Sequence, residues 1–293
     1  MGGEVSLCRR IAPTEAPCLQ THSSAGTQHD PSLDPPIASQ HRAGNALHRS
    51  LGQLTGAGRV SRLKRVGELS EISYANGAKY VGEARGSQKH GRGTLTEPNG
   101  DIYEGCFVCD QLCGQGRFAA ADGSAYFGQW LADRPHGRGE ETRADGSSYE
   151  GQYVYGRPQG EGCLRWPDGT VYEGGFCAGE LHGCGTYATP KGLRYEGAWR
   201  RNRRHGQGRL LLPDGTEYVG EFFDNRRQGS GCLRSKDGAV YTGLFLADLP
   251  HGEGELALAD GSRLAGVWSA GTLVCGTAAP TQRTESPPPD GHP

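Results

Sequence analysis

The chain has 293 residues, of which 49 are glycine, and only 34% of its residues are hydrophobic. In an average protein glycine makes up about 7%. Here it does not recur at every third position, which excludes a collagen. A helical bundle is excluded because residues that favour long helices are scarce. The formal charge of −2 gives no support for binding to nucleic acid.

The aromatic residues mark the part of the chain that can fold. All 7 Phe, 12 Tyr and 4 Trp lie between Tyr74 and Trp268. The long segments outside this region are rich in small and polar residues and bury too little apolar surface to offset their ordering entropy. We therefore predict disordered tails. No run of 18 apolar residues occurs, and the N-terminus lacks the apolar core of a signal peptide.

The end of the N-terminal arm carries four apolar residues at helical spacing among basic ones, namely Val60, Leu63, Val66 and Leu69. One interpretation of this segment is a short basic amphipathic helix. The other is a solvated basic segment that leads into the first strand, and it is favoured because Gly67 interrupts the helical pattern.

A 23-residue period runs through the centre of the chain without insertion or deletion. Each copy begins with Tyr and carries Gly at 2, 11, 13 and 20 residues after it, so eight copies account for 32 of the 49 glycines. The tyrosines are Tyr80, Tyr103, Tyr126, Tyr149, Tyr172, Tyr195, Tyr218 and Tyr241. A partial copy precedes the array and a decayed copy follows it, as expected for the caps of stacked repeats.

Each copy predicts a β-hairpin followed by a turn. Tyr, Gly and an aromatic residue alternate along the first strand, as in Tyr126, Gly128 and Trp130, which places them on one face of a sheet. Gly, Asn or Asp follows at the position where a tight turn needs a left-handed backbone. Every copy ends in Asn-Gly or Asp-Gly, a strong hairpin signal, except at Lys191–Gly192. We expect each ring to lie over glycine backbone of its own sheet.

These patterns predict an all-β protein, an elongated single-layer antiparallel ribbon of β-hairpins with disordered N- and C-terminal tails. The expected organisation is a disordered arm at 1–65, a capping half-repeat at 66–79, eight repeats at 80–263, a decayed terminal repeat at 264–275 and a tail at 276–293.

The order Tyr-x-Gly-x-aromatic, His-Gly-x-Gly and Asp-Gly at this period resembles the MORN repeat, most completely in YEGAWRRNRRHGQGRLLLPDGTE at 195–217. The resemblance covers residues 80–263. It implies the hairpin-ribbon fold and roles in scaffolding, in cytoskeletal and ciliary structures, and in tethering to membranes. We therefore expect a non-enzymatic cytoplasmic scaffold that binds protein partners, and its regular exposed face makes a homodimer plausible. The alternative is a peripheral membrane module that binds phosphoinositides or is anchored by lipid.

Five histidines form a column, that is, they occupy the same position in their repeats, directly before the second glycine. They are His90, His136, His182, His205 and His251. Equivalent atoms of neighbouring repeats lie about 9.6 Å apart. Zinc needs histidine nitrogens within about 2.1 Å, so neighbours in the column cannot share an ion. The resemblance implies that this residue caps the hairpin turn instead, and we predict no metal site.

The triplet Cys106, Cys109 and Cys113 has spacing closer to that of metal ligands. Small apolar filling is the default interpretation, and metal binding or oxidant sensing is the alternative.

The repeated Gly-x-Gly lacks the Gly-Lys-[Ser/Thr] of a phosphate loop, and no hydrolase or metalloprotease motif occurs. A single-layer sheet offers little enclosed volume for chemistry. We predict no catalytic residue and no cofactor.

Basic residues gather at two successive hairpin tips, namely Arg200, Arg201, Arg203, Arg204, Arg226 and Arg227. One hypothesis is that these six side chains contact an anionic lipid or an acidic partner. The other is a solvated tip that protects the ribbon from aggregation.

The N-terminus, Met1-Gly2-Gly3-Glu4-Val5-Ser6, fits the N-myristoylation pattern. Cys8 follows, and a palmitoyl chain there would supply the second signal that stable anchoring requires. Gly2 and Cys8 are therefore candidate lipidation sites, although the pattern also arises by chance.

Overall fold

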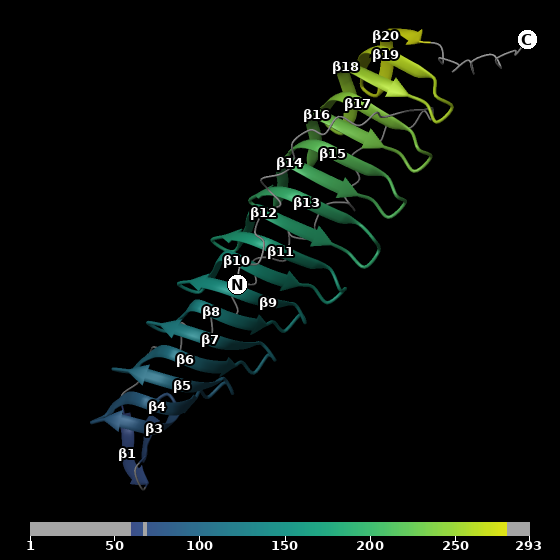
Figure 1. The fold of residues 1–293 in the computed structure, drawn as a ribbon. Coiled ribbons are helices and arrows are strands. Elements are labelled where there is room, and N and C mark those ends of the chain that lie inside the picture. Colours follow the sequence, from purple (N-terminus) through teal and green to yellow (C-terminus); the bar gives the residue numbers. More distant parts are fainter. Residues whose placement is uncertain (1–59, 67–68, 280–293) are drawn as a thin grey trace, which may run out of the picture. The chain divides into compact units, whose positions relative to one another are not determined.

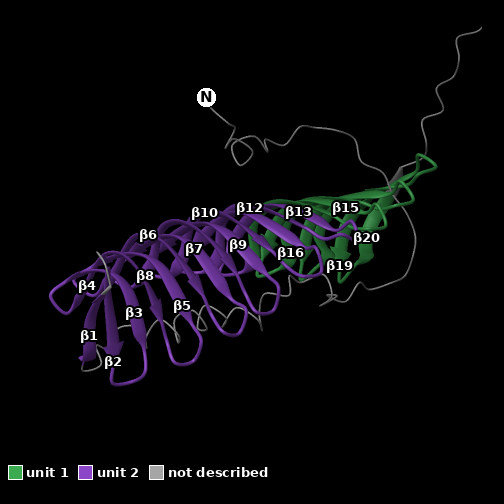
Figure 2. Ribbon diagram, turned by 90° about the horizontal axis from the view of Figure 1, so that it is seen from below, with its two compact units in different colours: residues 1–33, 204–293 green, residues 34–203 purple. Residues whose placement is uncertain are grey.

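The computed structural model describes residues 60–66 and 69–279 (Figure 1). The described chain divides into two compact units, one up to residue 203 and the other from residue 204 (Figure 2). In each unit, consecutive strands pair antiparallel in chain order and form one sheet layer, as at β3–β4 and β17–β18. No helix occurs in either described range. The fold-class prediction, an all-β single-layer antiparallel sheet of hairpins, is confirmed.

The strands are short and regular. They are β1 (Val60–Val66), β2 (Leu69–Tyr74), β3 (Lys79–Arg85), β4 (Gln88–Thr96), β5 (Ile102–Val108), β6 (Gln111–Ala119), β7 (Ala125–Leu131), β8 (Arg134–Thr142), β9 (Ser148–Val154), β10 (Arg157–Arg165), β11 (Val171–Cys177), β12 (Glu180–Ala188), β13 (Arg194–Arg200), β14 (Arg203–Leu211), β15 (Glu217–Phe223), β16 (Arg226–Arg234), β17 (Val240–Leu246), β18 (Leu249–Ala257), β19 (Arg263–Ser269) and β20 (Thr272–Ala279).

Two boundaries differ from the expected ones. β1 begins at Val60, inside the segment expected to be disordered, and the amphipathic-helix interpretation of this segment is wrong. β20 continues to Ala279, beyond the expected end of the decayed repeat. β1 pairs with β2 through its backbone, while the side chains of residues 61–65, such as Leu63 at 48% exposure, remain in solvent. Amino-acid composition indicates only which segments can bury apolar side chains, so it could not reveal a strand whose side chains are mostly exposed. The remaining parts of both predicted tails lie outside the described residues.

The turn that ends each repeat follows from its small and polar residues. The glycines that end the eight repeats have φ between 84° and 94°, the left-handed region that favours glycine. In most copies the preceding Asp or Asn accepts a hydrogen bond from the backbone N–H two residues on, as Asp168 does from Thr170 at 2.9 Å. At the Lys191 exception, Thr189 Oγ1 accepts the bond from Leu193 N instead.

The core is a ladder of aromatic rings on one face of the sheet. Most repeat tyrosines pack edge-to-face against the aromatic residue of their own first strand and that of the next repeat. Tyr126, for example, meets Trp130 at 5.0 Å and Tyr153 at 5.3 Å between ring centroids. Its hydroxyl donates to the carbonyl oxygen of Gln129 at 2.9 Å. Such pairs contribute about 0.5–1.5 kcal/mol each beyond area burial.

Glycine makes room for these rings. In the third repeat, Gly128 and Gly139 are paired across β7 and β8, and Tyr126 lies over both. A Cβ atom at Gly139 would overlap the hydroxyl and ring carbons of Tyr126. The expectation that rings lie over glycine backbone is confirmed, and the glycine content of the chain follows from this packing.

We expect Gly139→Val to lower the free energy of unfolding by about 1–3 kcal/mol, because the Tyr126 ring must leave its site. Thr142→Val in the same strand, at an exposed position, is the control and should change it by less than about 0.5 kcal/mol. Urea unfolding followed by circular dichroism measures both. Equal unfolding midpoints for the two variants would contradict the packing argument.

Alkaline pH should unfold the sheet. Burial raises the pKa of seven of the repeat tyrosines, that of Tyr241 to about 12 and that of Tyr126 further. An unfolded tyrosine titrates near pH 10. Because the folded pKa lies above the unfolded one, the stabilisation is complete below about pH 10 and is lost as pH rises through the folded values. We expect tyrosinate absorbance at 295 nm and loss of circular dichroism to rise together above that pH. Ionisation of the tyrosines at a pH well below that of unfolding would contradict this expectation.

A clamp joins neighbouring repeats. It pairs the residue nine positions after a repeat tyrosine with the turn residue seven positions after the next tyrosine. Where the first residue has a backbone N–H, an Asp or Asn Oδ1 accepts it at 2.8–2.9 Å. These pairs are Lys89–Asp110, Leu112–Asp133, Leu181–Asn202, Arg204–Asn225 and Arg227–Asp248. Where the first residue is proline, the second is glycine, in Pro135–Gly156, Pro158–Gly179 and Pro250–Gly271.

One repeat replaces part of the apolar core with a buried polar cluster. Glu141, 5% exposed, stands where most copies have Leu. Its Oε2 accepts hydrogen bonds from Arg143 Nη2 and from the Tyr153 hydroxyl, both at 3.1 Å. Tyr153 in turn stands in a column otherwise occupied mainly by Phe and Trp. Burial and then the Glu141 carboxylate raise the pKa of Tyr153. The two departures from the repeat pattern therefore compensate each other.

Candidate partner-binding groove

The face opposite the aromatic ladder is open to solvent. Residues one, three and five positions after each repeat tyrosine project from this face, because side chains alternate along a strand. Several are apolar and exposed: Val81 is 47% exposed, Phe127 is 57% exposed and Val154 is 43% exposed. This face, unlike the ring-filled core, therefore presents apolar side chains that another molecule can contact.

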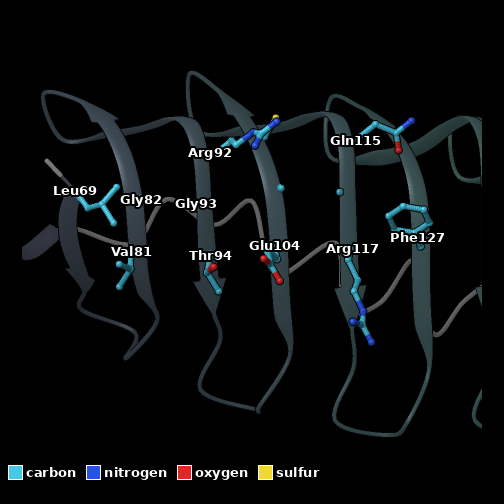
Figure 3. A pocket seen from close by; sticks show the side chains of 13 residues that line it. Leu69, Val81, Gly82, Arg92, Gly93, Thr94, Glu104, Gln115, Arg117 and Phe127 are labelled. Atoms are coloured by element: carbon cyan, nitrogen blue, oxygen red, sulfur yellow. The ribbon is translucent and has the colours of Figure 1, made fainter.

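A groove crosses this face from β2 to β7 and has a volume of about 680 Å³ (Figure 3). Its floor is a row of glycine backbone, one residue per strand, directly opposed in register: Gly82, Gly93, Gly105 and Gly116. The groove therefore runs across the strands. Its volume lies in the range of about 300–1,000 Å³ that is usual for ligand sites.

Side chains on both sides of the glycine row form the walls. Along one wall, Thr94, Glu104 and Arg117 follow one another at opposed positions on successive strands, and Arg92 and Gln115 lie along the other (Figure 3). The two ends are apolar, with Leu69 and Val81 at one end and Phe127 at the other.

The charged groups of the groove are available for a partner. Arg92, Glu104 and Arg117 are exposed, and within residues 60–66 and 69–279 none of the three side chains forms an ion pair. The carboxylate of Glu83 is engaged nearby, because its Oε1 accepts a hydrogen bond from the backbone N–H of Arg92 at 2.9 Å.

The family model of the MORN repeat matches eight consecutive segments, and together they span more than half of the chain. They are residues 80–102, 103–125, 126–148, 149–171, 172–194, 195–217, 218–240 and 241–263. The chain belongs to the MORN-repeat family. The predicted array of eight repeats is thereby confirmed, with the predicted boundaries.

Solved structures with similarity to these MORN repeats have low scores. The TCP10 domain of Danio rerio CPAP, in complex with a peptide of Danio rerio STIL, is 14% identical with a TM-score of 0.44, covering 74% of this chain and 99% of that chain. The SAS-4 (dCPAP) TCP domain of Drosophila melanogaster, in complex with a proline-rich motif of Ana2, is 12% identical with a TM-score of 0.27, covering 71% and 96%. Both scores are too low to inform function. The sequence matches no curated protein.

The six candidate arginines at the tips of the MORN hairpins do not share one environment. Arg200, Arg201, Arg203 and Arg226 are exposed. Arg204 is only 3% exposed; its guanidinium lies over the ring of Phe222 and donates to the carbonyl oxygen of Asn225.

Arg227 is half-buried and likewise engaged. Its Nη2 donates to the carbonyl oxygen of Asp248 at 2.8 Å, and its guanidinium lies 5.7 Å from the ring centroid of Phe245. Arg204 and Arg227 are therefore core residues of the clamp, and the expectation that they line a surface is corrected. Each lies nine positions after a repeat tyrosine. In the second strand of a MORN hairpin, side chains at odd-numbered distances from that tyrosine face the aromatic ladder.

The histidine column contacts the next hairpin turn. The His136 ring packs against Tyr155 at 5.2 Å, and its Nδ1 accepts a hydrogen bond from the Tyr155 backbone N–H at 3.5 Å. Gln159 occupies the same column and accepts from Ala178 N at 2.9 Å. These contacts agree with the capping role that the family motif implies.

Cys106, Cys109 and Cys113 are free thiols, and only Cys106 reaches the groove. In the described ranges no group of three or more His, Cys, Asp or Glu is arranged to hold a metal ion. Nor does this part of the chain contain a helix long and apolar enough to cross a membrane. Gly2 and Cys8, the candidate lipidation sites, lie outside the described residues, so their modification stays a prediction.

The groove was not predicted as a site from sequence. The residues of its walls fall at positions of the repeat that vary from copy to copy, which by itself marks only a solvent-exposed face. The available signal was Phe127, a large aromatic residue in a column that otherwise holds mainly Glu, Val and Thr.

Proposed function

We propose that this MORN-repeat chain is a non-enzymatic scaffold that binds protein partners through the groove over β2 to β7. The observation that carries the proposal is the groove itself, in which exposed apolar ends flank charged side chains without ion-pair partners. An exposed apolar surface rimmed by polar groups is typical of an interaction site. The aromatic ladder beneath it gives a pre-formed surface, which reduces the entropy lost on binding.

An unbiased peptide display tests this proposal. Full-length protein should select a family of peptides whose binding is lost in the variant Val81→Lys with Phe127→Lys. The matched control is Leu131→Lys with Val154→Lys, two exposed positions on the same face outside the groove, and it should retain binding. Selected peptides that bind the groove variant as well as the parent would overturn the proposal, as would a display that selects none.

We further propose that the partners belong to cytoskeletal or ciliary structures in the cytoplasm, and that the protein can pair as a homodimer. The support is membership of the MORN-repeat family, whose members act in such structures. Imaging of the tagged protein together with microtubule and basal-body markers tests the location. A distribution that matches neither marker would count against it. Sedimentation equilibrium tests the dimer, which a monomer mass at all concentrations would exclude.

A second candidate function, attachment to anionic membranes, rests on three exposed arginines at one hairpin turn. Arg200 ends β13, Arg201 lies in the turn and Arg203 begins β14. Each basic residue near an anionic surface contributes about 1 kcal/mol, so changing all three to Ala should weaken binding to phosphoinositide vesicles by roughly two orders of magnitude. Arg134→Ala with Arg157→Ala, exposed residues at other tips, is the control. Unchanged flotation of the triple variant would leave these residues as a solvated tip.

A further inference from the structure

The groove presents its chemistry in a fixed order across the strands. Leu69 and Val81 form an apolar end at β2 and β3, Arg92 follows on β4, Glu104 on β5, Arg117 on β6 and the apolar Phe127 on β7. The order is apolar, basic, acidic, basic, apolar.

We propose that the groove selects an extended peptide segment with the complementary order, namely apolar, acidic, basic, acidic, apolar. This inference rests on the proposed function and names the partner's chemistry. The charge complementarity carries it, because Arg92, Glu104 and Arg117 each lack an ion-pair partner in the described chain. Charged groups arranged in this way set specificity more than raw affinity.

The dimensions fix the length of the segment. Four strand steps from β3 to β7 correspond to about 19 Å, because neighbouring strands lie about 4.8 Å apart. An extended chain covers this distance in about six or seven residues at 3.3 Å each. The floor of glycine backbone lets the main chain of such a segment approach closely, while its side chains reach the two walls.

The test compares two fluorescein-labelled peptides of equal length by fluorescence anisotropy with the full-length protein. The first is Leu-Glu-Lys-Ser-Glu-Ser-Leu, which has the complementary order. Because side chains alternate along an extended chain, its first Glu faces the wall of Arg92, while its Lys and second Glu face the wall of Glu104 and Arg117. The second is Leu-Lys-Glu-Ser-Lys-Ser-Leu, in which each charge is inverted. We expect the first to bind at least tenfold more tightly at low ionic strength, and the difference to shrink in 0.5 M salt.

A charge-swapped variant provides the decisive arm. Arg92→Glu, Glu104→Arg and Arg117→Glu together should reverse the preference, so that the inverted peptide binds at least tenfold more tightly than the first. The matched control, Arg157→Glu with Arg165→Glu, alters exposed arginines outside the groove and should keep the parent's preference. All five positions changed are exposed, so both variants should fold, which circular dichroism verifies.

Equal affinity of the two peptides for the parent would overturn the proposal, as would a variant that keeps the parent's preference or binding of neither peptide. Failure here is distinguishable from failure of the scaffold proposal. If display selects groove-dependent peptides that lack the alternating charges, the groove binds a partner of different chemistry and only the charge order is wrong.

Discussion

Glu141→Leu should lower the free energy of unfolding by about 3–5 kcal/mol, although it restores the residue that most repeats carry. The substitution leaves the Arg143 guanidinium, 13% exposed, without its carboxylate, and the Tyr153 hydroxyl without its acceptor. A buried charge that loses its partner costs far more than the net value of the pair. Urea unfolding followed by circular dichroism and tryptophan fluorescence measures the loss.

The control converts the whole cluster to the pattern of the other repeats. Glu141→Leu, Arg143→Leu and Tyr153→Phe together leave no polar group of the cluster unpaired. Leucine already occupies the position equivalent to Arg143 in two other repeats, as Leu212 and Leu258. We expect the triple variant to recover most of the loss, because replacing a buried ion pair by apolar residues is often neutral or stabilising. A triple variant as unstable as Glu141→Leu alone would show that the cluster is not a coupled unit.

Asp133→Ala should cost about 2–4 kcal/mol. The Asp133 carboxylate accepts a hydrogen bond from the Leu112 backbone N–H at 2.8 Å, and the residue has a left-handed φ of 64° that alanine adopts poorly. Asp133→Asn should be nearly neutral, because Asn202 and Asn225 perform the same role in other repeats. Comparing the thermal unfolding of the two variants separates two effects. Asp133→Ala removes the hydrogen-bond acceptor and the tolerance of a left-handed backbone, whereas Asp133→Asn removes only the charge.

A double variant tests whether the clamp is a pairwise rule. Leu112→Pro removes the donor, and Asp133→Gly removes the acceptor, which reproduces the pair Pro135 and Gly156 of the next repeat. We expect the double variant to be more stable than the sum of the single changes predicts, since residues in one hydrogen-bond pair couple by about 0.5–3 kcal/mol. Strict additivity would contradict the clamp.

Local regularity made most of the fold predictable. The alternation of Tyr, Gly and an aromatic residue predicted one buried face, and the Asp-Gly steps predicted the turns, because both signals act between residues close in sequence. The boundaries at Val60 and Ala279 were missed because β1 and β20 are held by backbone pairing with one neighbour, while side chains such as Leu63 and Val274 stay exposed.

The candidate site could not be predicted in the same way. Leu69 and Phe127 are 58 residues apart in the numbering, and they line one groove only because five strand pairings place them on the same face. Likewise, Arg203 and Arg204 look alike in sequence, yet one is exposed and the other buried. The strand alternation beyond the turn decides which guanidinium faces the rings.

By itself, then, the sequence determined the repeat, its hairpins, its turns and the ring-over-glycine core, since each depends on backbone preferences and spacing within 23 residues. Only the tertiary structure decided which side chains meet between repeats. The pairing of Leu112 with Asp133, the compensation of Glu141 by Tyr153 and the charge order of the groove all join separate hairpins. Their physical reason is register: strand pairing brings residues 12 to 21 positions apart within hydrogen-bond distance, and each pair then constrains both partners.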